Sequence, residues 1–308
     1  MGRNPEREVF DHGRYVEAQR DFRVFSGLCK RFGSMTYSME EFEKAKGKIL
    51  SKLLLPYISP AEEPQAFLIV GQPGAGKTTM ARIFTSQLEK NVIFISGDEY
   101  RRFHPRFSDL IKQYGDEAVL HTQEFAGKMT EALIDELSSR KYNLIIEGTL
   151  RTVEVPAKTK FQLERRGYDV TMAAILVRPE VSYLSTIKRY QRMQEFGSVP
   201  RKTPKNHHDL VVSAIAKNIG LLHRTKEFPH IQVYNRQGDR LCDTMETPAI
   251  NPGDIFKNEF ERPLSQQERD RIVKDFAAYV PKDRILAVMD EYKGASTLSH
   301  PMERGRGK

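Results

Sequence analysis

The stretch of the sequence with the clearest chemistry is a glycine-rich loop that joins an apolar run to a helical segment. Residues 71–78 read Gly-Gln-Pro-Gly-Ala-Gly-Lys-Thr, which fits the phosphate-binding pattern G-x-x-x-x-G-K-[ST]. Its glycines let consecutive backbone N–H groups close around a phosphate at a helix N-terminus, whose partial positive charge adds to the attraction. Lys77 would neutralise the outer phosphates of a nucleotide, and the Thr78 hydroxyl is a natural Mg²⁺ ligand. The residues predicted at this site are Gly71, Gln72, Pro73, Gly74, Ala75, Gly76, Lys77, Thr78 and Thr79.

Two carboxylates follow the next apolar runs of the sequence. Asp98 ends the stretch Ile-Ser-Gly-Asp, and Glu147 follows Leu-Ile-Ile. Because ligands bind beyond the carboxyl ends of the strands in an open parallel sheet, we expect both side chains beside the phosphates. Asp98 is a candidate to take the proton of a hydroxyl nucleophile, and the alternative is a cap for the turn that follows. Glu147 is a candidate to hold a metal-bound water or to accept hydrogen bonds from substrate hydroxyls, and the alternative is a structural carboxylate.

A basic stretch lies further along the chain. It comprises Ile-Lys-Arg-Tyr at 187–190 and Ser-Val-Pro-Arg-Lys at 198–202. Arginines in such a segment can close over a triphosphate and stabilise the charge that develops on a transferred phosphoryl group. The alternative is a solvated basic face. Together with a phosphate-binding loop, the stretch predicts a cationic lid that carries Arg189 and Arg201.

These residues need a sheet to bring them together, and the sequence predicts one. Five short segments have strand character, at 67–70, 92–95, 143–146, 170–177 and 231–234. Segments with helical periodicity lie between them, notably at 77–89, 118–139, 155–166, 181–196 and 208–227. Strands that alternate with helices predict an α/β fold, with a parallel sheet flanked by helices on both faces. We expect residues 60–253 to form this domain.

The two ends of the chain are predicted to add helices to this domain. Residues 1–59 form an N-terminal helical extension, which includes a capping box at Ser38 and Glu41 followed by apolar residues at helical spacing. Residues 254–308 are polar and form a helical C-terminal tail whose last residues fray. The further helices expected in the two ends lie at 14–31, 265–279 and 283–293.

Composition bounds the class of protein. The 308 residues include 39% hydrophobic and 29% charged residues, which is typical of a globular chain. Because the apolar runs are too short to cross a bilayer and the N-terminus lacks a secretory signal, we expect a cytoplasmic protein without a membrane partner. Cys29 and Cys242 lack metal-ligand spacing, which favours two free thiols in a reducing compartment. The net charge of +8 favours anionic partners, but the sequence has no pattern of interleaved aromatics and cations, so nucleic acid is not the expected partner.

Six motifs in one order resemble those of a known family. The motifs GQPGAGKTT, GDEYRRFHP, MTEAL, NLIIEGTLR, IKRY and TPKNHHD resemble those of the zeta toxins, the toxin kinases of bacterial toxin–antitoxin systems, and the resemblance runs over residues 66–252. It implies a P-loop kinase fold. It also implies that ATP and Mg²⁺ are used to phosphorylate a sugar hydroxyl of UDP-N-acetylglucosamine, or of other UDP-sugars, and that this blocks the use of a cell-wall precursor.

The resemblance also implies roles for individual residues. Asp98 takes the general-base position, and Lys77 is the lysine needed for transfer. Arg189 and Arg201 are the arginines that clamp the phosphates. The residues expected to bind the sugar nucleotide are His104, Glu131, Glu147, Thr149 and Arg151.

Two other functions and one regulatory question stay open at this point. A P-loop kinase for another hydroxyl acceptor, such as a nucleoside cofactor, an antibiotic or a polynucleotide end, shares the loop and the base. A nucleotide-gated basic binding protein is the second alternative. Because antitoxins of the family block the nucleotide site, a separate antitoxin protein is an expected partner. Residues 1–59 are a candidate inhibitor in cis, and the alternative is an ordinary packing extension.

Overall fold

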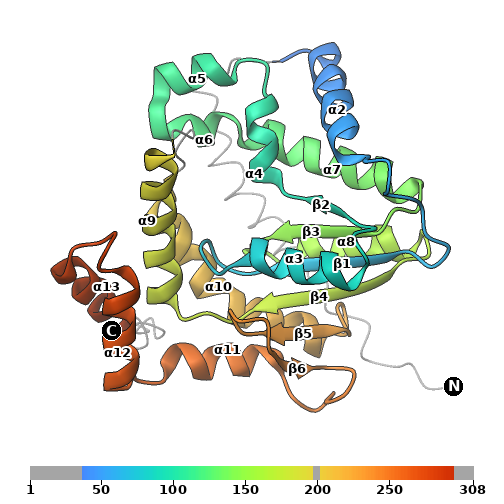
Figure 1. The fold of residues 1–308 in the computed structure, drawn as a ribbon. Coiled ribbons are helices and arrows are strands. Elements are labelled where there is room, and N and C mark those ends of the chain that lie inside the picture. The colour runs from blue at the N-terminus through green and yellow to red at the C-terminus, as the bar shows by residue number, and fades with distance from the viewer. Residues whose placement is uncertain (1–36, 197–201, 295–308) are drawn as a thin grey trace, which may run out of the picture.

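A six-stranded sheet forms the centre of the molecule (Figure 1). The computed structural model describes residues 37–196 and 202–294. The strand order is β2-β3-β1-β4-β5-β6, in which the first five strands run parallel and β6 is antiparallel to β5. The strands are β1 (Gln65–Val70), β2 (Ile93–Ile95), β3 (Leu144–Gly148), β4 (Asp169–Ile175), β5 (Ile231–Tyr234) and β6 (Arg240–Asp243). The predicted α/β fold with a flanked, mostly parallel sheet is confirmed.

Helices connect and flank these strands. They are α2 (Met39–Leu53), α3 (Lys77–Gln87), α4 (Gly97–Tyr100), α5 (Phe107–Tyr114), α6 (Ala118–His121), α7 (Gln123–Ser139), α8 (Glu154–Glu164), α9 (Pro179–Glu195), α10 (Lys205–Arg224), α11 (Pro252–Glu261), α12 (Gln266–Phe276) and α13 (Lys282–Gly294), with short 3₁₀ turns η2 (Arg101–Phe103) and η3 (Gly115–Glu117).

Three predicted details differ from the structure. The helix expected at 118–139 is two helices, because the chain turns at Thr122 between α6 and α7. Strand β6 was not expected, since Arg240 and Asp243 make this four-residue edge strand polar. Helix α11 was not expected either, and it starts with Pro252 in the first turn, where proline fits without loss of a hydrogen bond. The helix expected around 14–31 lies outside the described residues.

The two faces of the sheet carry separate cores because successive side chains of a strand point to opposite sides. On β1, Leu68 and Val70 face the larger core, which is formed with α2, α7, α8, α10 and α11. Ile69 faces a smaller core formed with α3. Both faces are therefore covered by helices, as in most parallel sheets.

Helix α2, from the predicted N-terminal extension, belongs to the larger core. It begins with the predicted capping box, in which Ser38 and Glu41 bond to each other's backbone N–H groups at 3.1 and 2.8 Å. Phe42, Ala45 and Ile49 are buried on one side of the helix. In the described parts of the chain, no helix is both long and apolar enough to cross a membrane.

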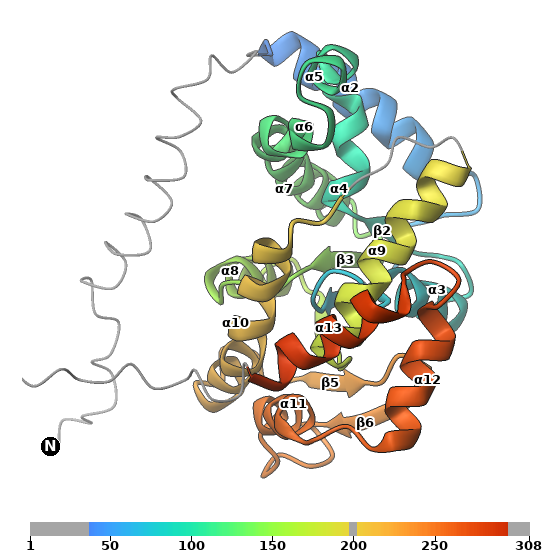
Figure 2. The ribbon, with the colours of Figure 1, turned by 90° about the vertical axis from the view of Figure 1, so that its left-hand side faces the viewer.

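The predicted C-terminal helices pack on α9, which crosses the carboxyl edge of the sheet (Figures 1 and 2). The side chains in this third cluster come from α9, α12, α13 and the turn before α13. They are Tyr183, Leu184, Ile272, Phe276, Val280, Ile285, Val288 and Met289. Cys242, on β6, is a buried free thiol, as predicted, and Cys29 lies outside the described residues.

A buried polar cluster joins α9, α10 and α13. His208, on α10, is fully buried. Its Nε2 lies 2.8 Å from Ser182 Oγ on α9, and its Nδ1 lies 3.0 Å from the Tyr292 hydroxyl on α13. Burial lowers the pKa of His208 to about 4, although the adjacent Asp209 carboxylate acts in the opposite direction. His208 is therefore uncharged at neutral pH.

The lowered pKa of His208 predicts a loss of stability in mild acid. The unfolded chain binds this proton at a pKa of 6.5 and the folded chain only at about 4, so the stabilisation is present above pH 6.5 and is lost as the pH falls toward 4. Between about pH 7.5 and about pH 5 this group should lower the free energy of unfolding by about 2 kcal/mol. Denaturant titrations of wild type and His208→Gln at both pH values measure it. The same pH dependence in both proteins would contradict the prediction.

The close packing of α10 on α11 predicts that Gly253 tolerates no side chain. A Cβ there would lie 2.4 Å from the Ala216 carbonyl oxygen and 2.8 Å from the Gly220 backbone. Gly253→Ala should lower the free energy of unfolding by about 1–3 kcal/mol, since the helices must move apart. Gly127→Ala on α7 is the matched control, because nothing lies within 4 Å of its Cβ position, and it should raise stability by about 0.5–1 kcal/mol. Equal denaturation midpoints for the two variants would show that the contact is unimportant.

Candidate active site

The loop between β1 and α3 has the shape of a phosphate cradle. Gly74 and Gly76 have φ angles of 80° and 102°, in the region that glycine adopts without strain. Helix α3 begins directly after Gly76, at Lys77. Because the first N–H groups of a helix have no partner within it, the start of α3 offers several donors to an anion.

Lys77 joins the loop to β3 through a short chain of polar contacts. Its Nζ donates to the carbonyl oxygens of Gly71 at 3.0 Å and Gln72 at 3.2 Å, and it lies 3.5 Å from Glu147 Oε1. The other carboxylate oxygen of Glu147 accepts a 2.6 Å hydrogen bond from Ser96 Oγ. The structure therefore brings together two predicted site residues, Lys77 and Glu147. Ser96 joins them through its hydrogen bond to Glu147. It was not predicted as a site residue, because a single serine outside any motif gives no signal in the sequence.

Asp98 lies in the first turn of α4, just after β2. Ser96 occupies the N-cap position of this helix, so Asp98 is not its cap. Asp98 Oδ1 accepts a 2.9 Å hydrogen bond from Arg101 Nε, and the Arg101 guanidinium also donates to the Val119 carbonyl oxygen at 2.6 Å. The Asp98 side chain is 60% exposed. A carboxylate that is oriented by a guanidinium and open to solvent is able to accept a proton from a bound hydroxyl.

The loop after β3 carries Thr149 and Arg151, and α10 holds it in place. Leu150, between them, is buried with a φ of 56°, which is uncommon for a residue with a side chain. Asn218, on α10, donates to the carbonyl oxygens of Leu150 and Arg151, each at 3.0 Å. Such a strained backbone persists only where its surroundings hold it, and it is found often at functional sites.

Charged groups from several elements surround His207 at the start of α10. Burial lowers its pKa, as does the positive charge of Arg151, whereas the Asp98 carboxylate acts in the opposite direction. Arg101 and Lys77 lower the pKa further. His207 thus lies within electrostatic reach of four charged side chains from separate parts of the sequence. His207 is not among the residues predicted for the site, although it lies in the motif TPKNHHD.

His104 and Glu131 are placed away from these groups. His104 is only 4% exposed, and its ring packs edge-on against Tyr37 and Phe125 at centroid distances of 5.6 and 5.1 Å. Glu131, on α7, is exposed, lies 3.8 Å from Lys158 Nζ and lines a separate cavity of about 470 Å³. The structure gives His104 a packing role, and substrate contacts of both residues stay predictions.

A second cavity, of about 850 Å³, adjoins the phosphate-binding loop between α9, the β5–β6 connection and α12. Arg236 connects the two, since its Cγ lies 3.6 Å from the position of a Cβ at Gly76. Arg189 lines the cavity and donates to Thr203 Oγ1 at 3.0 Å, whereas Arg201 lies outside the described residues. The cationic side chains around the cavity are Arg178, Lys188, Arg189, Arg192, Arg236 and Arg271.

The donor set around Thr78 fits a Mg²⁺ ion that is held mainly by a nucleotide. Among the residues that the structure describes, no group of three or more His, Cys, Asp or Glu side chains could hold a metal ion. Mg²⁺ at a nucleotide needs only one or two protein oxygens, because phosphates and waters fill the other positions. Thr78 is exposed at the start of α3, and the Glu147 carboxylate lies beside the adjacent Lys77.

Comparisons with known proteins identify relatives across most of the chain. The sequence pattern of the family described as zeta toxin matches residues 52–247. Toxin PezT of Streptococcus pneumoniae serotype 4 is 39% identical over 237 residues, which are 77% of this chain and 93% of the relative. Toxin zeta of Streptococcus pyogenes is 38% identical over 235 residues, 76% of this chain and 82% of the relative. A solved structure from a study of the PezAT chromosomal toxin–antitoxin system of Streptococcus pneumoniae has a TM-score of 0.70 and 35% identity, and the match covers 83% of this chain and 98% of that one.

The geometry of the loop predicts that Gly74→Ala weakens nucleotide binding in a folded protein. A Cβ at Gly74 would lie 2.1 Å from the Ser182 carbonyl oxygen, and the positive φ adds strain. The loop must therefore move, and its N–H groups no longer converge on one phosphate. We expect the Kd for Mg²⁺–ATP, measured by calorimetry, to rise at least about tenfold. Gly47→Ala, whose Cβ would meet nothing within 4 Å, is the control and should bind as wild type does. Unchanged binding by Gly74→Ala would refute the assignment of the loop.

Proposed function

The chain belongs to the zeta toxin family, and on this premise we propose that it is an ATP-dependent kinase that phosphorylates a sugar hydroxyl of UDP-N-acetylglucosamine. The observation that carries the proposal is the position of Asp98. It is an exposed carboxylate beyond the carboxyl end of β2, at the same edge of the sheet as the phosphate-binding loop. A kinase for hydroxyl acceptors needs a proton acceptor at this place, whereas a nucleotide-binding switch does not.

The proposed reaction transfers the γ-phosphoryl group in one step. The sugar hydroxyl gives its proton to a carboxylate oxygen of Asp98 while its own oxygen bonds to the γ-phosphorus. The bond from the γ-phosphorus to the bridging oxygen breaks, and that oxygen stays on ADP. Arg101 orients Asp98 through the 2.9 Å contact, so that a carboxylate lone pair is held in one direction.

Cations of the chain would stabilise the negative charge of this step. Lys77 lies at the loop, and its Nζ already forms an ion pair with the Glu147 carboxylate. The same Nζ would pair with a phosphate oxygen. Arg189 and, by family resemblance, Arg201 would clamp the triphosphate. Mg²⁺ held by the Thr78 hydroxyl would supply further charge neutralisation at the phosphate oxygens. Glu147, Thr149 and Arg151 would bind the acceptor.

The cavity lined by α9 and α12 is the proposed site of the donor nucleoside. It adjoins the loop at Arg236, and its volume of about 850 Å³ is large enough for a nucleoside. Burial lowers the pKa of Arg236, while the Asp275 carboxylate acts in the opposite direction. A guanidinium in this position would lie beside the phosphates that enter the loop.

A protein antitoxin is the proposed partner. The related solved structure comes from a toxin–antitoxin system, and a protein that covers the nucleotide site would block the reaction. Inhibition in cis by the N-terminal extension is the alternative. Phe42 and Ile49 of α2 are buried in the core, so a detachable inhibitor would have to lie before α2. Removal of residues 1–36, rather than 1–59, is therefore the informative truncation.

Transfer from γ-labelled ATP with Mg²⁺ tests the proposed reaction and the role of Asp98. The acceptors are UDP-N-acetylglucosamine, other UDP-sugars, free N-acetylglucosamine and a short oligonucleotide. We expect label on a UDP-sugar. Asp98→Asn should lower turnover by at least about 100-fold, because it removes the proton acceptor and keeps the side-chain volume. Lys77→Ala should have an effect of similar size, because it removes a cation from the phosphates.

Glu99→Gln is the matched control for Asp98→Asn. Glu99 lies next to Asp98 on the same short helix and pairs at 3.8 Å with Arg102, on the surface. This variant should retain turnover within about twofold of wild type. Label that appears only on the oligonucleotide or on inorganic phosphate would contradict the sugar-kinase proposal. Near-normal transfer by Asp98→Asn would contradict its role as the base.

A further inference from the structure

The phosphate-binding loop rests on one short segment, residues 177–182, which includes the end of the link from β4 and the first turn of α9. The Gln72 amide donates to the Val177 carbonyl oxygen at one end of the segment. At the other end, the Ser182 carbonyl oxygen fills the space where Gly74 would otherwise carry a Cβ. The position of this segment therefore sets the shape that the loop can adopt.

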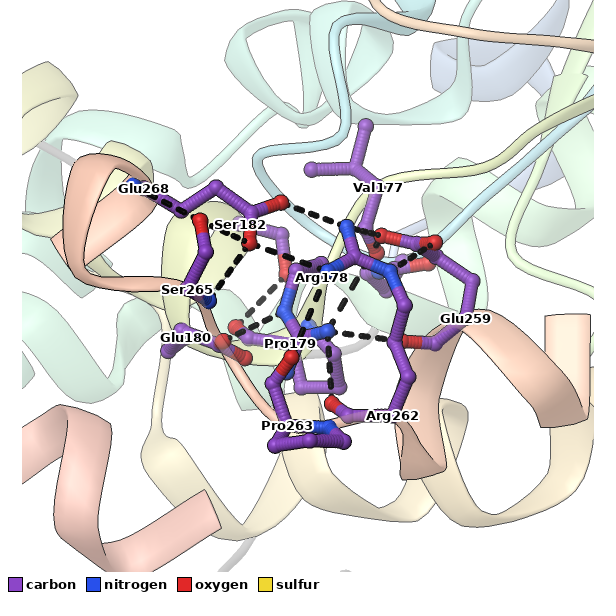
Figure 3. Close-up of polar contacts among 11 residues, drawn as sticks. Val177, Arg178, Pro179, Glu180, Ser182, Glu259, Arg262, Pro263, Ser265 and Glu268 are labelled. Atoms are coloured by element: carbon purple, nitrogen blue, oxygen red, sulfur yellow. Dashed lines mark hydrogen bonds and ion pairs between the residues drawn. The ribbon is translucent and has the colours of Figure 1, made fainter. Parts of the chain in front are cut away.

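A charged cluster from α11 and α12 holds the start of this segment (Figure 3). Arg178 Nε lies 2.6 Å from the buried Glu180 carboxylate, and the same guanidinium donates to the carbonyl oxygens of Glu259 at 2.8 Å and Arg262 at 3.0 Å. Arg262 in turn pairs with Glu268, in the capping box of α12, and lowers the pKa of that carboxyl to about 2. The turn between α11 and α12 is thus bonded directly to residue 178.

The buried cluster around His208 holds the other end of the segment, through α13. The uncharged His208 has one N–H, which its Nδ1 donates to the Tyr292 oxygen, so its Nε2 accepts from the Ser182 hydroxyl at 2.8 Å. The Nδ1 of His208 faces the Tyr292 hydroxyl at 3.0 Å, and this hydroxyl donates to Asp209 Oδ1. A chain of hydrogen bonds therefore runs from α13 to the residue that touches Gly74.

Lys205, at the start of α10, links this helix to α13 close to Tyr292. Lys205 Nζ lies 2.6 Å from Asp209 and 3.4 Å from Glu291, and it sits 4.9 Å from the centroid of the Tyr292 ring. Burial acts to lower the pKa of Lys205, but its contacts with the Asp209 and Glu291 carboxylates together outweigh this and the pKa is raised. Tyr292 is therefore held from both sides, by its ring and by its hydroxyl.

We propose that α11, α12 and α13 form a brace that sets the shape of the nucleotide-binding loop through residues 177–182, with Tyr292 as a positioning residue for the donor nucleotide. Tyr292 acts through His208 and Ser182 and touches neither loop nor substrate. The inference rests on the proposed function only in requiring that the loop binds a nucleoside triphosphate, and it does not depend on the acceptor. It assigns a function to the C-terminal helices, which lie beyond the region that matches the family pattern.

Tyr292→Phe in the full-length protein tests this proposal, because it removes the hydroxyl and keeps the ring. The Kd for Mg²⁺ with adenylyl imidodiphosphate, a non-hydrolysable ATP analogue, is measured by calorimetry without any acceptor. We expect it to rise about three- to tenfold, as the loss of one buried hydrogen-bonded contact predicts. The KM for ATP should rise in parallel, and the KM for the acceptor should stay within about twofold of wild type. A role in stability alone would lower the active fraction and leave the Kd unchanged.

Tyr279→Phe is the matched control. Tyr279 lies in the turn before α13, in the same apolar cluster as Tyr292, and the change again removes one hydroxyl. Its Kd should equal that of wild type. Asp209→Asn removes the charge that pairs with Lys205 and leaves a weaker acceptor for the Tyr292 hydroxyl. It should raise the Kd in the same direction as Tyr292→Phe, and it serves if that variant does not fold. Wild-type Kd values in Tyr292→Phe or Asp209→Asn, or an equal rise in Tyr279→Phe, would overturn the proposal. Because the assay contains no acceptor, an error in the acceptor's identity does not change its reading.

Discussion

The contact between Gly74 and the first turn of α9 is the constraint on which the rest of the site depends. The Ser182 carbonyl oxygen lies where a Cβ of residue 74 would be, so the loop and the helix fit together in only one way. Interiors packed this closely do not deform gradually. A phosphate cradle works only if its N–H groups converge on one point, and here a helix packed against the loop fixes that convergence.

The charged groups at the carboxyl edge of the sheet follow a common pattern. Each carboxylate is held by a cation or a hydroxyl of a neighbouring element, as in Glu147 with Lys77 and Ser96, and Asp98 with Arg101. Such contacts orient the acids before substrate binds, which reduces the reorganisation that the reaction requires. Cationic side chains also line the adjoining cavity, where the proposed anionic nucleotide would offset their mutual repulsion.

Much of the fold followed from local patterns. The apolar runs predicted β1 to β5, and the capping box predicted the start of α2, because these signals depend on neighbours in the sequence. Edge strand β6 escaped prediction because it is polar. Helix α11 escaped it although Asn251 caps its start and Pro252 suits the first turn. At the site, the motif GQPGAGKTT identified Lys77 and Thr78, whereas Ser96 and Arg236 carry no motif signal of their own. His207 lies in the motif TPKNHHD, but nothing in that motif alone sets it apart from its neighbours. Their places depend on which elements the fold brings together.

The sequence by itself determined the chemistry: a phosphate-binding loop, two carboxylates at strand ends, and a resemblance strong enough to identify the family. These features are local, since each depends on residue types at short spacing. Only the tertiary structure decided what surrounds them. The packing buries the His104 ring among aromatic side chains and places Glu131 at a separate cavity. It also brings Tyr292 within hydrogen-bonding distance of His208. Contacts between residues so far apart in the chain follow from the packing of helices on a common sheet, and no spacing rule along the sequence encodes them.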